Sequence, residues 1–322
     1  MRIDWMSRRA FVCAGAGTLL FGMVAGAASK FAIAPSWKSR YEADWNDAVG
    51  KSVLDIPYGD GEANRFDLYL PADVSRESYS LVVYLHAGGF TSGDKADDAS
   101  MLQWLCSKGY VACGINYTLF SDAHPEASVR SQSLEVRDAA PVVVQRAGNL
   151  GYPIGQMAIA GGSAGGCLAL IYAYRDSAAA PVPLRMVFEA VGPASMDRED
   201  WTNYGLDKDD QAAASLLGTM AGVPLSAEDV RSGEYLEKVR DVSAVAWVGP
   251  DTVPTVMAYG AKDKVAPFLS SVRLDAALDS AGVDHEYFVL PHSGHGLQND
   301  DDIFRQYMEA VERYLDICLP VC

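Results

Sequence analysis

Basic residues are scarce in this sequence, and none of them gather into a run. The 322 residues include 26 Lys or Arg against 42 Asp or Glu, which gives a formal net charge of −16. A surface this acidic repels phosphate backbones, whereas a nucleic-acid-binding protein needs a basic patch. We therefore expect no nucleic acid among the partners of this protein.

Cysteines are also few and irregularly spaced. There are six, and no Cys-x-x-Cys pair occurs, so the sequence predicts neither a zinc site nor a disulfide framework. Cys167 is expected to be a small packing residue in a helix. Near the C-terminus, Cys318 and Cys322 can form a late bridge or remain free thiols, and the sequence leaves both open.

Internal repeats and low-complexity linkers are absent as well. Apolar residues make up 49% of the chain and aromatic residues 10%, which is typical of a folded globular protein. The length allows one or two domains. The organisation therefore has to be read from the order of the predicted elements.

The N-terminal segment has the pattern of an export signal. Residues 10–28 carry no charge, small residues lie near 25–27, and Arg8-Arg9 followed by Phe11 resembles the twin-arginine type. We predict that residues 1–30 are such a signal and that the protein is exported. An uncleaved membrane anchor is the alternative. Without this segment 22 basic residues face 41 acidic ones, a net charge of −19.

From about residue 50 onward, short apolar runs alternate with longer helical stretches. Runs of this kind are typical of strands buried on both faces of a parallel sheet. We predict strands at residues 81–85, 111–115, 157–160, 186–188, 255–259 and 287–290, and helices near 97–108, 130–147, 164–175, 267–281 and 301–317. Residues 53–70 resemble antiparallel strands at the sheet edge, and Pro141 is expected to kink or restart its helix. The alternation predicts an α/β fold, a mostly parallel central sheet with helices on both faces.

Residues 192–253 interrupt this alternation. They contain acidic patches, two or three short helical stretches and no clear strand, and they are too long for an ordinary loop. We predict an insertion that forms a small cap over the carboxyl edge of the sheet. Residues 31–322 are then one domain with a cap at about 192–253.

A serine lies in a glycine-rich turn between a predicted strand and a predicted helix. Residues 161–165 read Gly-Gly-Ser-Ala-Gly, which matches Gly-x-Ser-x-Gly. Such a tight turn needs small neighbours around the serine, and the helix behind it favours negative charge near its N-terminus. The pattern predicts that Ser163 is a nucleophile. A plain glycine-rich turn is the alternative.

Two further glycines follow the predicted strand at 81–85. Residues 86–90 read His-Ala-Gly-Gly-Phe. Acyl transfer passes through an oxyanion that needs backbone N–H donors, and glycines let the backbone approach it closely. We predict that the N–H groups of Gly88, Gly89 and Ala164 form an oxyanion hole, and that His86 braces the loop.

An aspartate and a histidine follow two later strands. Asp263 comes after the predicted strand at 255–259, and His295 after the one at 287–290. The chain order serine, aspartate, histidine is one that catalytic triads take. We predict that His295 accepts the proton of Ser163 and that Asp263 orients the imidazole and stabilises its charged form.

Other residues compete for these two roles. His292 lies three residues before His295 on the same loop, and the glycines on both sides of His295 favour the latter. Asp251 and Asp284 are alternatives to Asp263, but neither directly follows a predicted strand. As structural alternatives, Asp263 can be a turn residue and His295 an ordinary loop histidine.

Together these motifs resemble the esterase branch of the α/β-hydrolases, near the hormone-sensitive-lipase-like and the bacterial feruloyl- and acetyl-esterase-like families. The resemblance covers roughly residues 50–317 and rests on the segments 86–90, 92–95, 116–117, 161–166, 260–263 and 294–296, which occur in the familial order. The sequence departs from the pattern at Ala87, where relatives carry the first of three glycines, and at Thr118, where they often carry arginine. The resemblance implies the α/β-hydrolase fold and a serine carboxylesterase mechanism without metal or cofactor.

The expected function is hydrolysis of a carboxylic ester through an acyl-enzyme intermediate, acting on a small-molecule or glycan-linked ester. The candidate pocket-lining residues are Phe90, Tyr117, Trp201, Tyr204, Leu216 and Leu217. Two alternatives remain open. One is an amide hydrolase of the peptidase or arylformamidase type, and the other is a non-catalytic hydrolase-fold protein that binds at the cell surface.

Overall fold

The structure, a computed structural model, describes residues 40–321. The predicted export signal at residues 1–30 lies outside this range, as does Cys322, one partner of the late bridge considered above. Within the range, no helix combines the length and the apolar character that crossing a bilayer requires.

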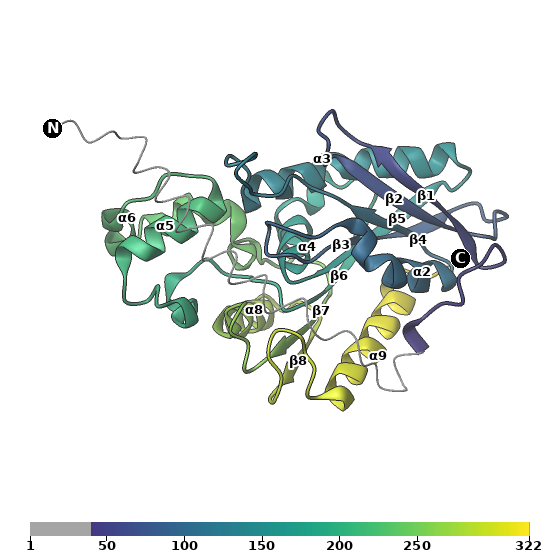
Figure 1. Cartoon of the computed structure of the whole chain (residues 1–322). Helices are drawn as coiled ribbons and strands as arrows, with labels where there is room; N and C mark the ends of the chain where they lie inside the picture. Colours follow the sequence, from purple (N-terminus) through teal and green to yellow (C-terminus); the bar gives the residue numbers. More distant parts are fainter. Residues whose placement is uncertain (1–39, 322) are drawn as a thin grey trace.

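In the described part of the chain, eight strands form one sheet through the centre of the molecule (Figure 1). They are β1 (Gly50–Pro57), β2 (Arg65–Pro71), β3 (Tyr79–Leu85), β4 (Val111–Ile115), β5 (Ile154–Gly162), β6 (Leu184–Ala190), β7 (Thr255–Gly260) and β8 (His285–Leu290). Their spatial order is β1-β2-β4-β3-β5-β6-β7-β8. Strand β2 runs antiparallel to β1 and β4, and every pair from β4 to β8 is parallel. The predicted α/β fold is confirmed.

Helices cover both faces of this sheet. Helices α2 (Ala99–Ser107) and α9 (Asp301–Cys318) lie on one face, and α3 (Val129–Asn149), α4 (Ala164–Arg175) and α8 (Phe268–Ala281) on the other (Figure 1). Helix α3 runs unbroken through Pro141, so the expected restart of the helix there is wrong. Pro141 lies on the exposed side of α3, where its ring and missing N–H group disturb no packed contact.

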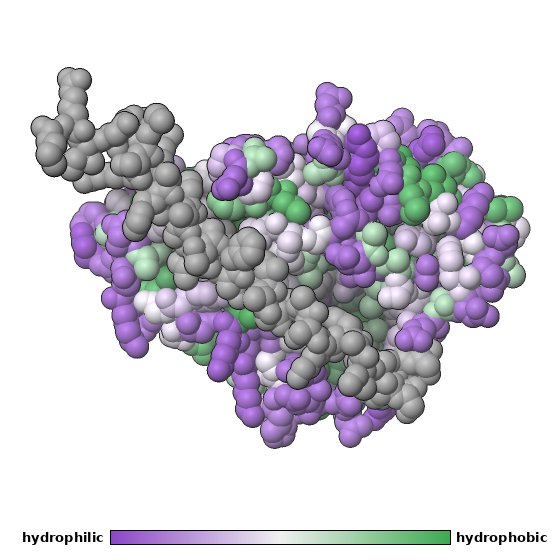
Figure 2. All heavy atoms as spheres, in the orientation of Figure 1, coloured by the Kyte–Doolittle hydropathy of each residue, from purple (hydrophilic) through white to green (hydrophobic). Residues whose placement is uncertain are grey.

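Burial explains why the strands are legible in the sequence. Every residue of β4 and β7 is buried, and β3 is buried except for Tyr84. Strands enclosed on both faces read as continuous apolar runs. The composition of the molecular surface differs from that of the strands, because polar and charged side chains cover most of the coloured surface in Figure 2.

The chain between β6 and β7 holds no strand. It forms α5 (Asp210–Ala221), α6 (Ala227–Ser232), α7 (Tyr235–Lys238) and several 3-10 turns. Helices α5 and α6 lie to the left of the sheet in Figure 1, and this segment also contacts α3, α4 and α8. We call it the β6–β7 segment. It coincides with the interval expected to form a cap.

Candidate active site

Ser163 lies in a strained turn between β5 and α4. Its backbone has φ 54° and ψ −118°, a conformation that non-glycine residues rarely adopt. Its N–H group donates to the carbonyl oxygen of Ala190, at 2.8 Å. Glycines make the turn possible, because a Cβ at Gly161 would lie 2.4 Å from the Gly165 carbonyl carbon, and one at Gly165 would lie 2.0 Å from the Leu85 oxygen.

The aspartate and the histidine expected to act with Ser163 lie beside it in one hydrogen-bonded row. His295 Nε2 is 2.8 Å from Ser163 Oγ, and His295 Nδ1 is 2.7 Å from Asp263 Oδ2. The other carboxylate oxygen of Asp263 accepts from the N–H groups of Val265, at 2.7 Å, and Ala266, at 3.0 Å. The carboxylate is therefore held in place, with its side chain 1% exposed. A row of this geometry can draw a proton from the serine hydroxyl.

The competing residues lie elsewhere. His292 points to Asp300, with its Nδ1 2.7 Å from the carboxylate, and its side chain is 69% exposed. Asp284 accepts a hydrogen bond from the Tyr314 hydroxyl, and Asp251 is an exposed residue of the loop before β7. None of the three has a hydrogen bond to Ser163 or His295 among the described residues.

The loop at residues 86–90 lies against the start of α4. A Cβ at Gly165 would be 2.7 Å from the His86 carbonyl oxygen as well as close to Leu85. Gly88 and Gly89 adopt φ values of 133° and 61°, which glycine reaches without strain. Ala164 is the first residue of α4, so its N–H group has no intrahelical partner. The start of the loop thus lies beside the start of α4, and the oxyanion hole of Gly88, Gly89 and Ala164 stays a prediction.

His86 and Tyr117 brace this loop from inside. Their rings stack with centroids 4.3 Å apart, and the Tyr117 hydroxyl donates to the His86 carbonyl at 2.9 Å. His86 Nδ1 lies 2.7 Å from the Ala87 carbonyl oxygen. Burial lowers the pKa of His86, which suits a neutral structural histidine.

The two predicted substrate contacts Phe90 and Tyr117 are buried in this structure. Tyr117 is 1% exposed and Phe90 is 3% exposed, so neither side chain lines an accessible surface. Phe90 also has a left-handed backbone, with φ 68°. Both residues shape the loop, because their side chains point into the core.

Gln132 is a supporting residue that the sequence did not reveal. It lies in α3 and is fully buried. Its Nε2 donates to the carbonyl oxygens of Phe90 and Thr118, both at 2.9 Å, so it ties the loop to the strand end after β4. No local sequence pattern marks Gln132 as a residue that contacts this loop.

The motif at residues 92–95 places a buried cation, Lys95, among carboxylates of which Asp67 is buried and Asp55 and Asp94 are exposed. Lys95 Nζ lies 2.7 Å from Asp55 and 3.3 Å from Asp67, and its side chain is 6% exposed. The Asn116 side chain donates to Asp94, at 2.6 Å, and accepts from the Lys95 N–H group, at 2.7 Å. A buried cation needs such partners. The network therefore fixes the chain that leaves the 86–90 loop.

The β6–β7 segment contacts the loop that carries Asp263 through Tyr204. The Tyr204 hydroxyl donates to the Val265 carbonyl at 2.8 Å, and burial, with a smaller contribution from Asp263, raises its pKa. Trp201 is fully buried and its indole N–H donates to Ser195. The remaining two predicted pocket residues, Leu216 and Leu217, are at most 1% exposed and pack inside the segment.

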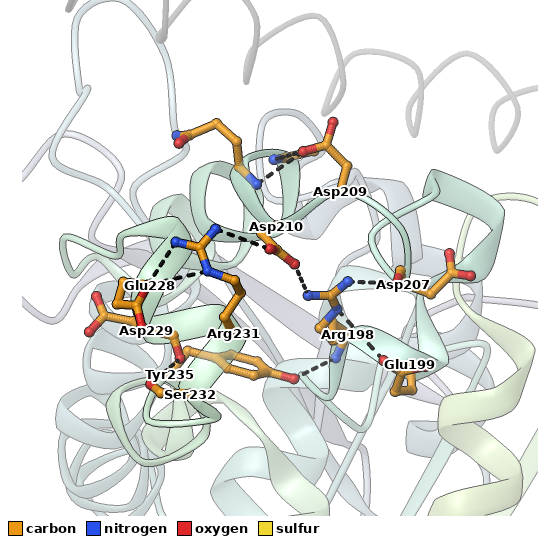
Figure 3. Close-up of polar contacts among 12 residues, drawn as sticks. Arg198, Glu199, Asp207, Asp209, Asp210, Glu228, Asp229, Arg231, Ser232 and Tyr235 are labelled. Carbon is orange, nitrogen blue, oxygen red and sulfur yellow. Dashed lines mark hydrogen bonds and ion pairs between the residues drawn. The ribbon is translucent and has the colours of Figure 1, made fainter.

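The outer part of this segment is joined by charged side chains (Figure 3). Arg198 pairs with Asp210 and donates to the Asp207 carbonyl. The other Asp210 oxygen lies 3.4 Å from Arg231, which also binds Glu228 at 2.7 Å. Within residues 40–321, no group of three His, Cys, Asp or Glu side chains could hold a metal ion.

Solved structures similar to this chain include esterases. It superposes on esterase B from Lactobacillus rhamnosis with a TM-score of 0.66 and 20% identity, over 92% of this chain and 96% of that one. A truncated carbohydrate esterase from gut microbiota gives a TM-score of 0.64 and 19% identity, over 82% and 98% of the two chains. At these identities the likeness establishes the fold.

Sequence comparison adds a curated relative and a family. Kynurenine formamidase of Salmo salar is 29% identical over 128 residues, which is 40% of this chain and 40% of the relative. The match thus spans about two fifths of that protein. The model of the BD-FAE family matches residues 66–278, which include Ser163 and Asp263. With its α/β-hydrolase fold, this chain belongs to the BD-FAE family.

Proposed function

We propose that this protein is a carboxylesterase-type serine hydrolase that acts through an acyl-enzyme intermediate. The hydrogen-bonded row of Asp263, His295 and Ser163, with distances of 2.7 and 2.8 Å, supports this most directly. The family and the esterase folds of its structural neighbours agree with it. Such a row makes an ordinary serine hydroxyl nucleophilic at neutral pH.

In the acylation step, Ser163 Oγ attacks the ester carbonyl carbon while its proton passes to His295 Nε2. Asp263 keeps the Nδ1–H of His295 directed at its own carboxylate and stabilises the imidazolium. The N–H groups of Gly88, Gly89 and Ala164 donate to the developing oxyanion. The C–O bond to the alcohol then breaks, and His295 gives its proton to the leaving oxygen.

In the deacylation step, His295 takes a proton from water, and the resulting nucleophile attacks the acyl carbon. The bond to Ser163 Oγ breaks, and the serine regains its proton from His295. The products are a carboxylic acid and the free enzyme. We propose a small-molecule or glycan-linked ester as substrate, with the β6–β7 segment acting as a cap over the site.

The test is hydrolysis of p-nitrophenyl acetate together with labelling by a fluorophosphonate probe. We expect Ser163→Ala and His295→Ala to lower kcat/KM by about 10⁴-fold or more, since the members of a triad act as a unit. Ser163→Ala should also abolish labelling. His292→Ala is the matched control, because the exposed His292 contacts Asp300, and it should keep wild-type turnover. Full activity of Ser163→Ala would falsify the assignment.

A second candidate is hydrolysis of an aryl formamide. The match to kynurenine formamidase favours it, and the same row could cleave a C–N bond, with His295 protonating the leaving amine. We expect comparison of kcat/KM for phenyl formate and formanilide to rank the two activities. Higher kcat/KM for formanilide would make amide hydrolysis the main activity.

A further inference from the structure

A carboxyl group that the proposed mechanism does not use lies behind the nucleophile turn. Glu189 is the second-last residue of β6, pairs in register with Gly161 of β5, and is 0% exposed. Its Oε2 accepts the N–H group of Gly192 at 2.9 Å. Its Oε1 has no hydrogen-bond partner among the described residues. Burying a carboxyl with so little compensation is costly, so its position calls for an explanation.

Glu189 begins a second turn, residues 189–192, which contacts the backbone of Ser163. Within this turn, the Ala190 carbonyl accepts the Ser163 N–H at 2.8 Å. Val191 has φ 53°, which is a genuine outlier for a β-branched residue. The Gly192 N–H is bound by Glu189, and the Gly192 carbonyl accepts from the Tyr259 hydroxyl at 2.6 Å. The strained Val191 is therefore fixed on both sides.

The same carboxyl fills the space between this turn and α4. A Cβ at Gly166 or at Gly192 would lie 2.9 Å from Glu189 Oε2. A Cβ at Gly192 would also lie 2.6 Å from the backbone nitrogen of Cys167. The Glu189 carboxyl thus lies against both segments that meet at Ser163, the start of α4 and the turn at Gly192. Neither segment can shift toward the carboxyl.

We propose that Glu189 is a positioning residue for Ser163. By binding the Gly192 N–H group, it keeps Val191 in its left-handed conformation and the Ala190 carbonyl at the Ser163 N–H, so that Oγ stays within reach of His295. This inference rests on the proposed serine-hydrolase function.

Among residues 40–321, no cationic side chain interacts with Glu189. The titratable side chains that interact with it electrostatically are Tyr84 from β3, Cys167 and Tyr174 from α4, Tyr259 from β7, Tyr287 from β8 and Tyr307 from α9. Burial raises the pKa of Glu189 to about 8, so the group is neutral at pH 7 and ionises as the pH rises through that value. An ionised carboxylate here would oppose the negative charge that forms at Ser163 in the transition state.

The experiment compares Glu189→Leu and Glu189→Gln with wild type. Glu189→Leu removes the acceptor for Gly192, and we expect kcat for p-nitrophenyl acetate and the fluorophosphonate labelling rate to fall about 10- to 100-fold, with KM nearly unchanged, because a misplaced nucleophile affects the chemical step. Glu189→Gln keeps an acceptor and cannot ionise. It should stay within about threefold of wild type at pH 7 and lack the decline in kcat that we expect of wild type above about pH 8.

Asp98→Asn is the matched control. Burial also raises the pKa of Asp98, to about 7, but this residue lies at the start of α2, and among the described residues its side chain makes no hydrogen bond to the serine turn. This variant should keep both the labelling rate and the alkaline decline. Hydrogen exchange of a peptide covering residues 160–168 gives a readout without activity, and it should become faster in Glu189→Leu than in wild type.

The outcomes separate the two proposals. A folded Glu189→Leu that is labelled and exchanges at wild-type rates overturns the positioning role. If Glu189→Leu does not fold, the role is overturned when Glu189→Gln, which keeps an acceptor for the Gly192 N–H group, falls well beyond threefold below the wild-type labelling rate. Absence of labelling in wild type refutes the proposed function instead, and hydrogen exchange of residues 160–168 in Glu189→Leu then still decides whether Glu189 holds the turn. If the leucine variant is unfolded, exchange in Glu189→Gln should match wild type, and faster exchange there overturns the role.

Discussion

The nucleophile turn and the outer part of the β6–β7 segment are held together in opposite ways. Around Ser163, backbone packs on backbone, and a single methyl group at Gly161 or Gly165 would meet main-chain atoms at 2.4 Å or less. In the segment, charged side chains such as Arg198, Asp210 and Arg231 connect one helix or turn to the next (Figure 3).

The difference concerns which perturbations each region tolerates. Close backbone packing does not depend on salt, but it cannot absorb an added atom. Exposed ion pairs are weak and screened by salt, yet their long side chains adjust to substitutions. The proposed chemistry thus depends on close backbone packing, whereas ion pairs between long side chains join the outer part of the proposed cap and tolerate substitution better.

The largest effect should come from an added methyl group at the turn. In Gly165→Ala the new Cβ would lie 2.0 Å from the Leu85 carbonyl oxygen, and we expect a loss of about 3 kcal/mol or more of unfolding free energy in urea. Gly148→Ala is the control, because nothing lies within 4 Å of its Cβ position in α3. It should stabilise by up to about 1 kcal/mol. Equal stability of the two variants would break the comparison.

A smaller effect is expected in the segment. Arg198 is 13% exposed and its loss leaves Asp210 short of a partner, so Arg198→Met should cost about 1–3 kcal/mol. Arg231 is 55% exposed, and Arg231→Met should cost about 1 kcal/mol or less. Repeating the urea titration at high salt should shrink only the Arg231 effect. If salt leaves both unchanged, ion pairing does not hold this region.

The smallest effect should appear where the two regions meet. Tyr204→Phe removes the hydrogen bond to the Val265 carbonyl, worth about 1 kcal/mol of stability. Because the N–H of Val265 binds Asp263, we also expect a fall of a few-fold in kcat/KM. Tyr314→Phe loses a comparable bond to Asp284, far from the row, and should lose stability alone. An equal fall in kcat/KM for both variants would show that the contact at Tyr204 has no special effect.

How much of the fold could be predicted depended on burial. The five inner strands β3 to β7 could be recognised because their central residues are buried on both faces. The edge strand β8 is mostly half-buried and was recognised from its apolar residues, whereas β1 has mostly exposed positions and was recognised only as part of an antiparallel lead-in. The row of Ser163, Asp263 and His295 was predictable because each residue follows a strand whose carboxyl end lies at one sheet edge.

The supporting residues could not be predicted in the same way. Whether Tyr117 lines a pocket or braces a loop depends on which way the chain faces after β4, and sequence periodicity ends with the strand. Gln132 binds Phe90, which lies 42 residues away in the sequence. Glu189 acts through a turn of unusual conformation at Val191. Such contacts exist only once the sheet has assembled.

The buried cysteines give the folded body its own set of reporters. Cys106 in α2, Cys113 in β4 and Cys167 in α4 are each at most 1% exposed, and burial raises the pKa of all three, that of Cys106 to about 12. Because thiolates are the reactive form, a thiol reagent can modify each site only when its surroundings open. The modification rates of these three cysteines therefore record local opening at three places, including the helix that starts at the nucleophile, without a cysteine being introduced.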